Sequence, residues 1–595
     1  MLHTLRDHGR SLGGEPGFRV REVRWCLDVA ADGRFLGVIP LGDGRRGQSL
    51  EYCTDMHGMP AGGKAHFLVE TTQSAVLLCK GDEDEAKLKG IADRHRFYRQ
   101  MIEQASLEVP ELAPLARLLT DDAAMTEVRA ALAVARAKPP DWLTWRIGEQ
   151  IPSANEAVQR WWRAWRANDL GPSSSEGKPG KRVVAQAHMV CMLSGELTVP
   201  LATHSKINGL AAVGGIAMGD ALISFDKTKA AFSSFGLVQA ANAAVGEVQA
   251  QYYVDGLNDL LRNHSRQIAN AKVAHWFKDK VPIADDPFAL LDGVESDESR
   301  ALTAQALARQ LLNAIRSGQR PDLIGNRFYA MTLSGASGRV MVRDWMEGSF
   351  EQLVEQVEAW FSALCIVARD GVGHARDPKF MAVCGALVLE LKDLTGSTTA
   401  ALWRSAAFGR AIPPALMAQA LARFRSALVD KDQPPINHAR MGLIKAYFIR
   451  NPNGGDTHMK PTVNPEHPSP AYQCGRLLAV LAGLQRAALG DVGAGVVQRF
   501  YAATSQSPGL LIGRLVANAR NHLGKLDGGL AWWYEERIAE IMGQLGDGAP
   551  RTLNLEGQGL FALGYYQQIA SMRAGNKGRS AGDQEAKQAE LDIQP

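Results

Sequence analysis

The chain has 595 residues, of which 46% are hydrophobic and 22% charged, and its formal net charge is +3. This length is typical of several domains and the composition is that of an ordinary globular protein. The net charge is too small to indicate nucleic-acid binding by itself. No run approaches the roughly 20 apolar residues that span a bilayer. The first residues, MLHTLRDHGRSLGGEPG, lack the apolar core of a signal peptide, so we expect a cytoplasmic protein without a membrane partner.

The seven cysteines are scattered along the chain, and none forms a C-x-x-C pair. Neither a structural zinc site nor a disulfide framework is therefore expected, and we predict no metal and no cofactor.

The front of the chain predicts a mixed α/β fold with antiparallel hairpins. Alternating apolar residues flank Asp32-Gly33, which is a strong hairpin signal. Strand pairs are expected at residues 23–29 with 35–39, 67–69 with 75–79, and 327–333 with 339–345. Helical spacing is expected at residues 82–102, 121–137 and 245–264.

From residue 350 onward the spacing is helical, which predicts an all-α C-terminal region. Expected helices lie at residues 350–364, 415–428, 472–488, 510–523, 530–545 and 557–574. Residues 451–470 are rich in Pro and Gly and predict a linker. The predicted domains are residues 1–345 (mixed α/β), 346–458 (basic helices), 459–575 (a C-terminal helical bundle) and 576–595 (a disordered tail).

A glycine-rich stretch at residues 206–242 is the first candidate binding site. Glycine lets a backbone approach a ligand closely, and lysines beside it suit phosphate. We expect a short strand at residues 222–225 within it. A surface loop between two strands explains the stretch as well. The candidate DNA contacts are Lys206, Asn208, Gly214, Gly215, Lys227, Lys229 and Asn242.

The second candidate is a basic segment at residues 401–450, which holds eight Lys and Arg against two Asp. An excess of six positive charges on helices suits a phosphate track, although a solvated helix surface stays an open alternative. Its candidate DNA contacts are Arg404, Arg410, Arg423, Arg425 and Lys445.

Two patterns resemble enzyme motifs without completing them. Residues 58–64 have the G-x-x-x-x-G-K spacing of a phosphate-binding loop, but Ala65 stands where Ser or Thr should hold magnesium. His374 and Asp377 cannot form a metal-dependent nuclease without further ligands. The motifs favour binding over catalysis, so we predict no catalytic residue. A metal-dependent nuclease or an NTPase acting on nucleic acid is the alternative, and a purely structural scaffold is a second one.

Five segments in order give the chain a family resemblance. They are VRWCLDVAADGRFLGVIPL, HSKINGLAAVGGIAMGDALISFDKTKAAFSSFGLVQAANAAVGE, RFYAMTLSGASGRVMVRDWMEG, ALWRSAAFGRAIPPAL and INHARMGLIKAYFIRN. Together they resemble the large subunit of the type I-C (Csd-type) CRISPR Cascade surveillance complex, over nearly the whole chain.

This resemblance implies a non-catalytic protein of antiviral defence. It implies recognition of the protospacer-adjacent motif on double-stranded DNA, aid in strand opening and R-loop stabilisation, and recruitment of a separate helicase–nuclease. The implied partners are the crRNA-containing backbone and 5′-end-binding subunits and the small subunit. It also implies that the C-terminal helices are similar to the small subunit and are made separately from an internal start. Met459, inside the expected linker, is the candidate start, and Met441 is the earlier alternative.

Overall fold

The computed structural model describes the chain except for residues 16, 43–46, 57–62, 82, 170–187, 227–235, 238, 293–302, 431–436, 451–455, 491, 493–494, 547 and 592–595. For residues 168–169 and 576–591 it describes the backbone alone. The chain divides into two compact units, one made of Met1–Gly209 with Ile216–Arg262 and the other of Leu210–Gly215 with Asn263–Pro595.

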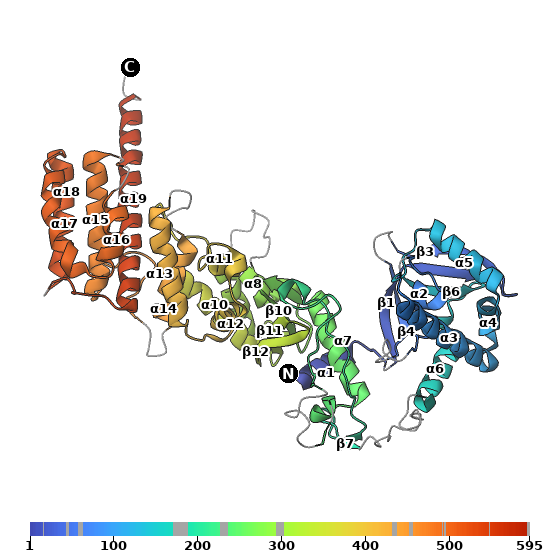
Figure 1. Ribbon diagram of the computed structural model, residues 1–595. Coiled ribbons are helices and arrows are strands. Elements are labelled where there is room, and N and C mark those ends of the chain that lie inside the picture. The colour runs from blue at the N-terminus through green and yellow to red at the C-terminus, as the bar shows by residue number, and fades with distance from the viewer. Residues whose placement is uncertain are drawn as a thin grey trace. The chain divides into compact units, whose positions relative to one another are not determined.

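The first unit mixes short strands with helices (Figure 1). Its helices and strands are α1 (Leu2–Ser11), β1 (Phe18–Val23), β2 (Trp25–Val29), β3 (Phe35–Pro40), β4 (Gln48–Thr54), β5 (Glu70–Thr71), α2 (Thr72–Val76), α3 (Glu85–Glu108), α4 (Ala113–Thr120), α5 (Asp122–Val134), β6 (Trp142–Ile147), α6 (Glu156–Asp169), β7 (Met189–Val190), β8 (Leu197–Thr198) and α7 (Glu247–Asn263).

A four-stranded sheet of order β3-β2-β6-β5 organises the core of this unit. The strands β2 and β6 are parallel, and the other neighbours are antiparallel. One hydrophobic core contains the fully buried rings of Trp145 in β6, Tyr98 in α3 and Trp162 in α6. The polar atoms of these rings are satisfied, since Trp145 Nε1 donates to Tyr98 Oη at 2.6 Å and Tyr98 Oη donates to the Leu68 carbonyl at 3.1 Å.

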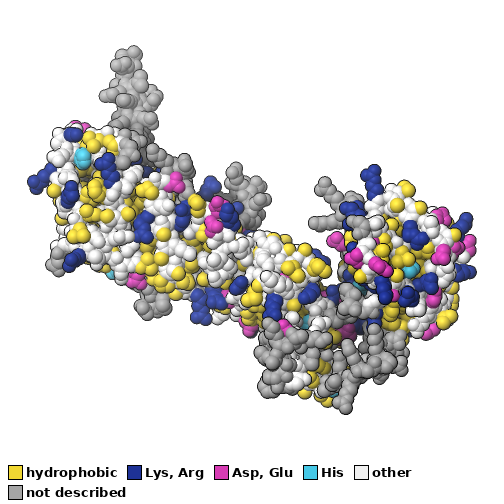
Figure 2. All heavy atoms as spheres, viewed as in Figure 1, with side chains coloured by type: hydrophobic (Ala, Val, Ile, Leu, Met, Phe, Trp, Pro, Cys, Tyr) yellow, Lys and Arg dark blue, Asp and Glu magenta, His cyan; other side chains and the backbone are white. Residues whose placement is uncertain are grey.

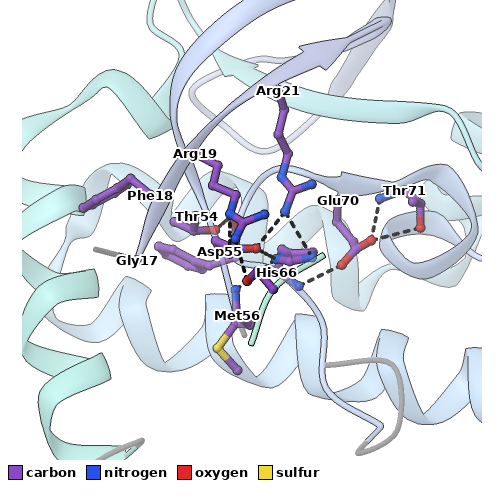
Figure 3. Close-up of polar contacts among 12 residues, drawn as sticks. Gly17, Phe18, Arg19, Arg21, Thr54, Asp55, Met56, His66, Glu70 and Thr71 are labelled. Carbon is purple, nitrogen blue, oxygen red and sulfur yellow. Dashed lines mark hydrogen bonds and ion pairs between the residues drawn. The ribbon is translucent and has the colours of Figure 1, made fainter. Parts of the chain in front are cut away.

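A network of charged side chains fixes the smaller β1–β4 sheet to the chain that enters β5 (Figure 3). Asp55, directly after β4, pairs with Arg19 at 2.7 Å and with Arg21 at 2.9 Å. The His66 backbone N–H donates to Glu70 Oε2 at 2.7 Å. Burial, and then the charge of Arg21, lower the pKa of His66. These partly buried charges are stable because each has an opposite charge or a hydrogen bond.

The second unit begins with strands and continues as helices. Its helices and strands are β9 (Ser265–Ile268), β10 (Ala271–Phe277), α8 (Pro287–Asp292), α9 (Ala304–Arg316), β11 (Arg327–Ala336), β12 (Arg339–Ser349), α10 (Phe350–Leu364), α11 (Phe380–Gly385), α12 (Gly396–Phe408), α13 (Pro414–Val429), α14 (His438–Ile449), α15 (Pro470–Leu489), α16 (Val496–Thr504), α17 (Pro508–Leu523), α18 (Gly528–Gln544) and α19 (Leu555–Leu591).

One hydrophobic core runs through this unit, from the antiparallel sheet of order β12-β11-β10-β9 to the last helices. Phe328 and Met346 of the sheet belong to the same core as Trp403 of α12 and Tyr566 of α19. Every residue from 471 to 481 of α15 is buried. Gly475 lets α15 and α19 approach closely, because a Cβ there would lie 2.0 Å from the Phe561 carbonyl oxygen. None of the described helices is long and apolar enough to cross a bilayer.

The predicted fold class, a mixed α/β front followed by a helical C-terminal region, is confirmed. The hairpins β2–β3 and β11–β12 and most expected helices are present. The strand pair expected at residues 67–79 is wrong, because Thr71 caps a helix there by accepting from the Ser74 N–H. The strand expected at residues 222–225 is absent from this described stretch. Helix α19 extends past residue 576, where a disordered tail was expected.

The described part of the expected linker, residues 456–470, is packed into the second unit. Met459, Asn464 and His467 are buried. The Gln473 amide donates to the His467 carbonyl at 2.7 Å, which fixes this segment to α15. Proline and glycine here shape an ordered irregular segment. The boundaries predicted at residues 345 and 458 both fall inside the second unit, whose core crosses them.

Candidate nucleic-acid interface

The glycine-rich stretch contributes exposed polar side chains to the first unit. Lys206 and Asn208 are both exposed. Asn258 of α7 holds their backbone, since its Oδ1 accepts from the Asn208 N–H at 2.8 Å and its Nδ2 donates to the Lys206 carbonyl at 3.3 Å. Asn242 is half-buried and donates to the Gln239 carbonyl at 2.9 Å. Lys227 and Lys229 lie outside the described residues.

Gly214 and Gly215 belong to the second unit and pack on the tip of β11. Gly214 has a φ of +92°, and a Cβ there would lie 2.8 Å from the Gly335 carbonyl oxygen. A Cβ on Gly335 would lie 2.1 Å from the Gly215 nitrogen. The glycines therefore serve a close contact between two backbones, a role that the sequence analysis did not anticipate.

The basic segment is divided by the fold. Lys445 lies inside the core in α14, with 1% of its surface exposed, and not on the expected surface track. Burial lowers its pKa to about 8. Arg423 and Arg425 of α13 are half-buried, and Arg425 donates to Gln558 at 2.9 Å. Arg404 and Arg410 are exposed. Figure 2 shows that Lys and Arg outnumber Asp and Glu on the visible face of the helical part.

Arg404 and Arg410 meet at one open cavity of about 550 Å³ between β12 and the α12–α13 connection. Its lining residues are Asp344, Trp345, Ala401, Arg404, Arg410, Ala411 and Pro413. These come from two of the five segments that carry the family resemblance, RFYAMTLSGASGRVMVRDWMEG and ALWRSAAFGRAIPPAL. We call this the Arg404–Arg410 cavity.

A buried carboxylate fixes one of the two arginines. Arg404 donates to both oxygens of Asp344, at 2.7 and 2.5 Å, and this bonding raises the pKa of Arg404. A bulge at Arg343 shifts the β11–β12 register just before Asp344. Two of the five guanidinium N–H groups are used in this pair, so the others remain for a ligand on the exposed side of Arg404.

The second arginine has a free guanidinium. Among the described residues Arg410 has no hydrogen-bonding or ionic partner, and it is exposed. It follows Gly409, the left-handed C-cap of α12, whose φ is +66°. This left-handed φ favours glycine at the turn, and a Cβ there would also lie 2.1 Å from Gln356 Oε1, the end of a flexible side chain. The cap therefore sets the direction in which Arg410 leaves α12.

An aromatic side chain completes the cavity. Trp345 is half-buried and stacks on Tyr329 with ring centroids 6.1 Å apart. Trp276 packs on both, at 5.6 Å from Trp345 and 5.4 Å from Tyr329. An arginine pair beside an indole ring can bind a phosphate and stack on a base. Sequence reasoning missed Asp344 and Trp345, although the quoted segment RDWMEG contains both.

The two incomplete enzyme motifs stay incomplete in the described part of the chain. Lys64 is half-buried, and the chain after it bends into β5 instead of starting a helix. His374 is exposed and pairs by its backbone with Val367, whereas the Asp377 carboxylate accepts from the Gln305 N–H at 2.9 Å. Within the described residues no group of three His, Cys, Asp or Glu side chains could hold a metal ion.

A family model described as a CRISPR-associated protein (Cas_Csd1) matches residues 3–573. The match extends from α1 into α19 and includes both units. The chain therefore belongs to the Cas_Csd1 family, which makes it a CRISPR-associated protein of the Cascade type, consistent with a type I-C large subunit. No curated protein matches the chain.

Proposed function

We propose that the chain is the non-catalytic large subunit of a crRNA-guided type I-C complex. It reads the protospacer-adjacent motif on duplex DNA, aids strand opening, stabilises the R-loop and helps to recruit a separate helicase–nuclease. Its partners are the crRNA-containing backbone and 5′-end subunits and the small subunit. Family membership supports this setting. In RNA-guided complexes pairing with the guide carries most of the sequence specificity, while the protein reads a short motif and the shape of the duplex.

The observation that carries the nucleic-acid role is the Arg404–Arg410 cavity. Arginines neutralise phosphates, and an aromatic face stacks on bases of any sequence. This combination suits a strand that has left the duplex, because bases within a duplex are already stacked. We assign the cavity to an opened DNA strand. Lys206 and Asn208 are proposed to contact the duplex at the flanking motif, where an Asn amide can pair with an adenine edge.

The test uses the reconstituted complex with the Arg410→Gln variant. Arg410 is exposed and unpaired among the described residues, so the substitution should leave the fold intact. Each lost phosphate contact should lower the slope of log affinity against log salt by about 0.7 for a single strand. R-loop yield, measured by permanganate reactivity of opened thymines, should fall several-fold, while discrimination of the correct flanking motif should be retained.

The matched control is Arg514→Gln, which removes an exposed arginine from α17. Unchanged salt slope and R-loop yield for Arg410→Gln would contradict the assignment of the cavity. Trp345→Ala should cost about 1–3 kcal/mol of strand binding if one base stacks there. Metal-dependent cleavage or ATP turnover that is lost in His374→Ala or Lys64→Ala would contradict the non-catalytic role.

A further inference from the structure

A second group of arginines lies away from the Arg404–Arg410 cavity. Arg369 is in the loop between α10 and α11, Arg486 in the last turn of α15, and Arg573 in α19. Burial lowers the pKa of Arg573, and the positive charges of Arg369 and Arg486 lower it further. Within the described part of the chain none of the three has an ion-pair partner. We call them the Arg573 cluster.

The loop that carries Arg369 is held rigidly on α19. Tyr566 Oη donates to the Val367 carbonyl at 2.6 Å, and Arg573 Nη1 donates to the Arg369 carbonyl at 3.2 Å. Gly371 has a φ of +83°, and a Cβ there would lie 2.0 Å from the Ala570 carbonyl oxygen. The fold therefore fixes the backbones of Arg369 and Arg573 beside each other, so the repulsion between their side chains is built into the native state.

The side chains of Arg369 and Arg573 border an open hollow of about 380 Å³, whose other lining residues are Ala368 and Asp370. Asp370 is the one carboxylate in this lining, and its Oδ1 accepts from the Val372 N–H at 3.0 Å. Two guanidinium groups against one carboxylate leave an excess of positive charge in the lining, and the charge of Arg486 adds to it at Arg573. The four residues that line the hollow include no aromatic side chain on which a base could stack, so a phosphate group fits this lining better than a base does.

We infer that Arg369, Arg486 and Arg573 hold the phosphates of a single DNA strand. This inference rests on the proposed function and adds a second, sequence-independent contact in the C-terminal helices. Anionic phosphate oxygens between the guanidinium groups would offset the repulsion that the folded protein otherwise carries. The three arginines come from different elements, which suits an extended backbone better than a single compact anion.

The test compares the salt dependence of single-stranded DNA binding by the full chain. The variant Arg369→Gln/Arg486→Gln/Arg573→Gln loses three contacts, each worth a slope of about 0.7, so its slope should fall by about 2. Between 50 and 200 mM salt, a fourfold change, the variant should therefore lose about 18-fold less affinity than the wild type. The control variant Arg499→Gln/Arg514→Gln/Arg520→Gln removes the same charge from exposed positions on α16 and α17 and should keep most of the slope.

Thermal unfolding separates this role from a structural one. Arg369→Gln/Arg486→Gln removes like charges and keeps the bond from Arg573 to the Arg369 carbonyl, so its Tm should equal or exceed that of the wild type. The cluster variant also loses that bond, so its Tm should not exceed that of the double variant. A lower Tm for both variants with an unchanged salt slope would overturn the inference. An unchanged slope in the cluster variant beside a reduced slope in Arg410→Gln would overturn the inference alone. No DNA binding by the wild-type complex would overturn the proposed function and the inference together.

Discussion

Lys445 gives the sharpest stability prediction, because a charged ammonium in the core opposes folding. The side chain is 1% exposed in α14, and its Nζ donates to the Ser362 carbonyl at 3.4 Å, a weak bond. Burial lowers its pKa from 10.5 to about 8. The folded protein therefore binds this proton less tightly than the unfolded chain does. Its stability should rise with pH between about 8 and 10.5, since the unfolded chain holds more protons in that window.

The shift also sets the size of the effect. A difference of 2.5 pKa units, at about 1.36 kcal/mol each, corresponds to a cost of about 3 kcal/mol at pH 7. At pH 9.5 the folded protein has already lost the proton, and the remaining cost is about 1 kcal/mol. Lys445→Met keeps the length of the side chain and removes its charge. We expect it to stabilise the second unit by about 2–3 kcal/mol at pH 7, after the loss of the Ser362 bond.

Urea unfolding at pH 7 and pH 9.5 tests this expectation. The stability difference between Lys445→Met and the wild type should shrink by about 2 kcal/mol between the two pH values. Comparison of two proteins at each pH cancels the titration of other Lys, Tyr and Cys groups. Lys525→Met, at an exposed position after α17, is the control and should show no pH-dependent difference. A difference that is the same at both pH values would refute the argument from burial.

Three further predictions concern single residues. Asp84→Ala should cost the first unit about 1 kcal/mol, because the Asp84 side chain accepts from the Lys87 N–H at the start of α3. Urea unfolding measures this cost, with Asp93→Ala, in the middle of α3, as the control. Stability should fall as the pH drops below about 6.5, since the lowered pKa of His66 means that the unfolded chain takes up the proton first, and His66→Gln should reduce this fall. A C-terminal tag on the full gene should reveal a second, short band, and Met459→Leu should remove that band. Because Met459 is buried, leucine should preserve the core. A single full-length band in both proteins would contradict an internal start.

Local patterns in the sequence determined the elements that depend on neighbouring residues. The Asp32-Gly33 turn between alternating strands was sufficient to predict the β2–β3 hairpin. The regular apolar spacing of residues 350–364 was sufficient to predict α10, and the predicted bounds of that helix agree with the structure. Short strands whose partners lie far away were not predictable in this way. β6 pairs in parallel with β2 across more than a hundred residues, and β5 has only two residues. Their pairing depends on tertiary contacts and not on local propensity.

The sequence also determined the family, through five ordered segments, and it placed two arginines of the Arg404–Arg410 cavity among the candidates. Charge counting alone treated Arg404, Arg410 and Lys445 as equivalent. Tertiary structure separated them: Arg404 is bound by a buried Asp344, Arg410 is free among the described residues, and Lys445 lies in the core. The Arg573 cluster was invisible in the sequence, because its members are 117 and 87 residues apart and contribute one charge each. Exposure and the meeting of distant charges are properties of the packed chain, so only the fold decided which of these residues a phosphate can reach.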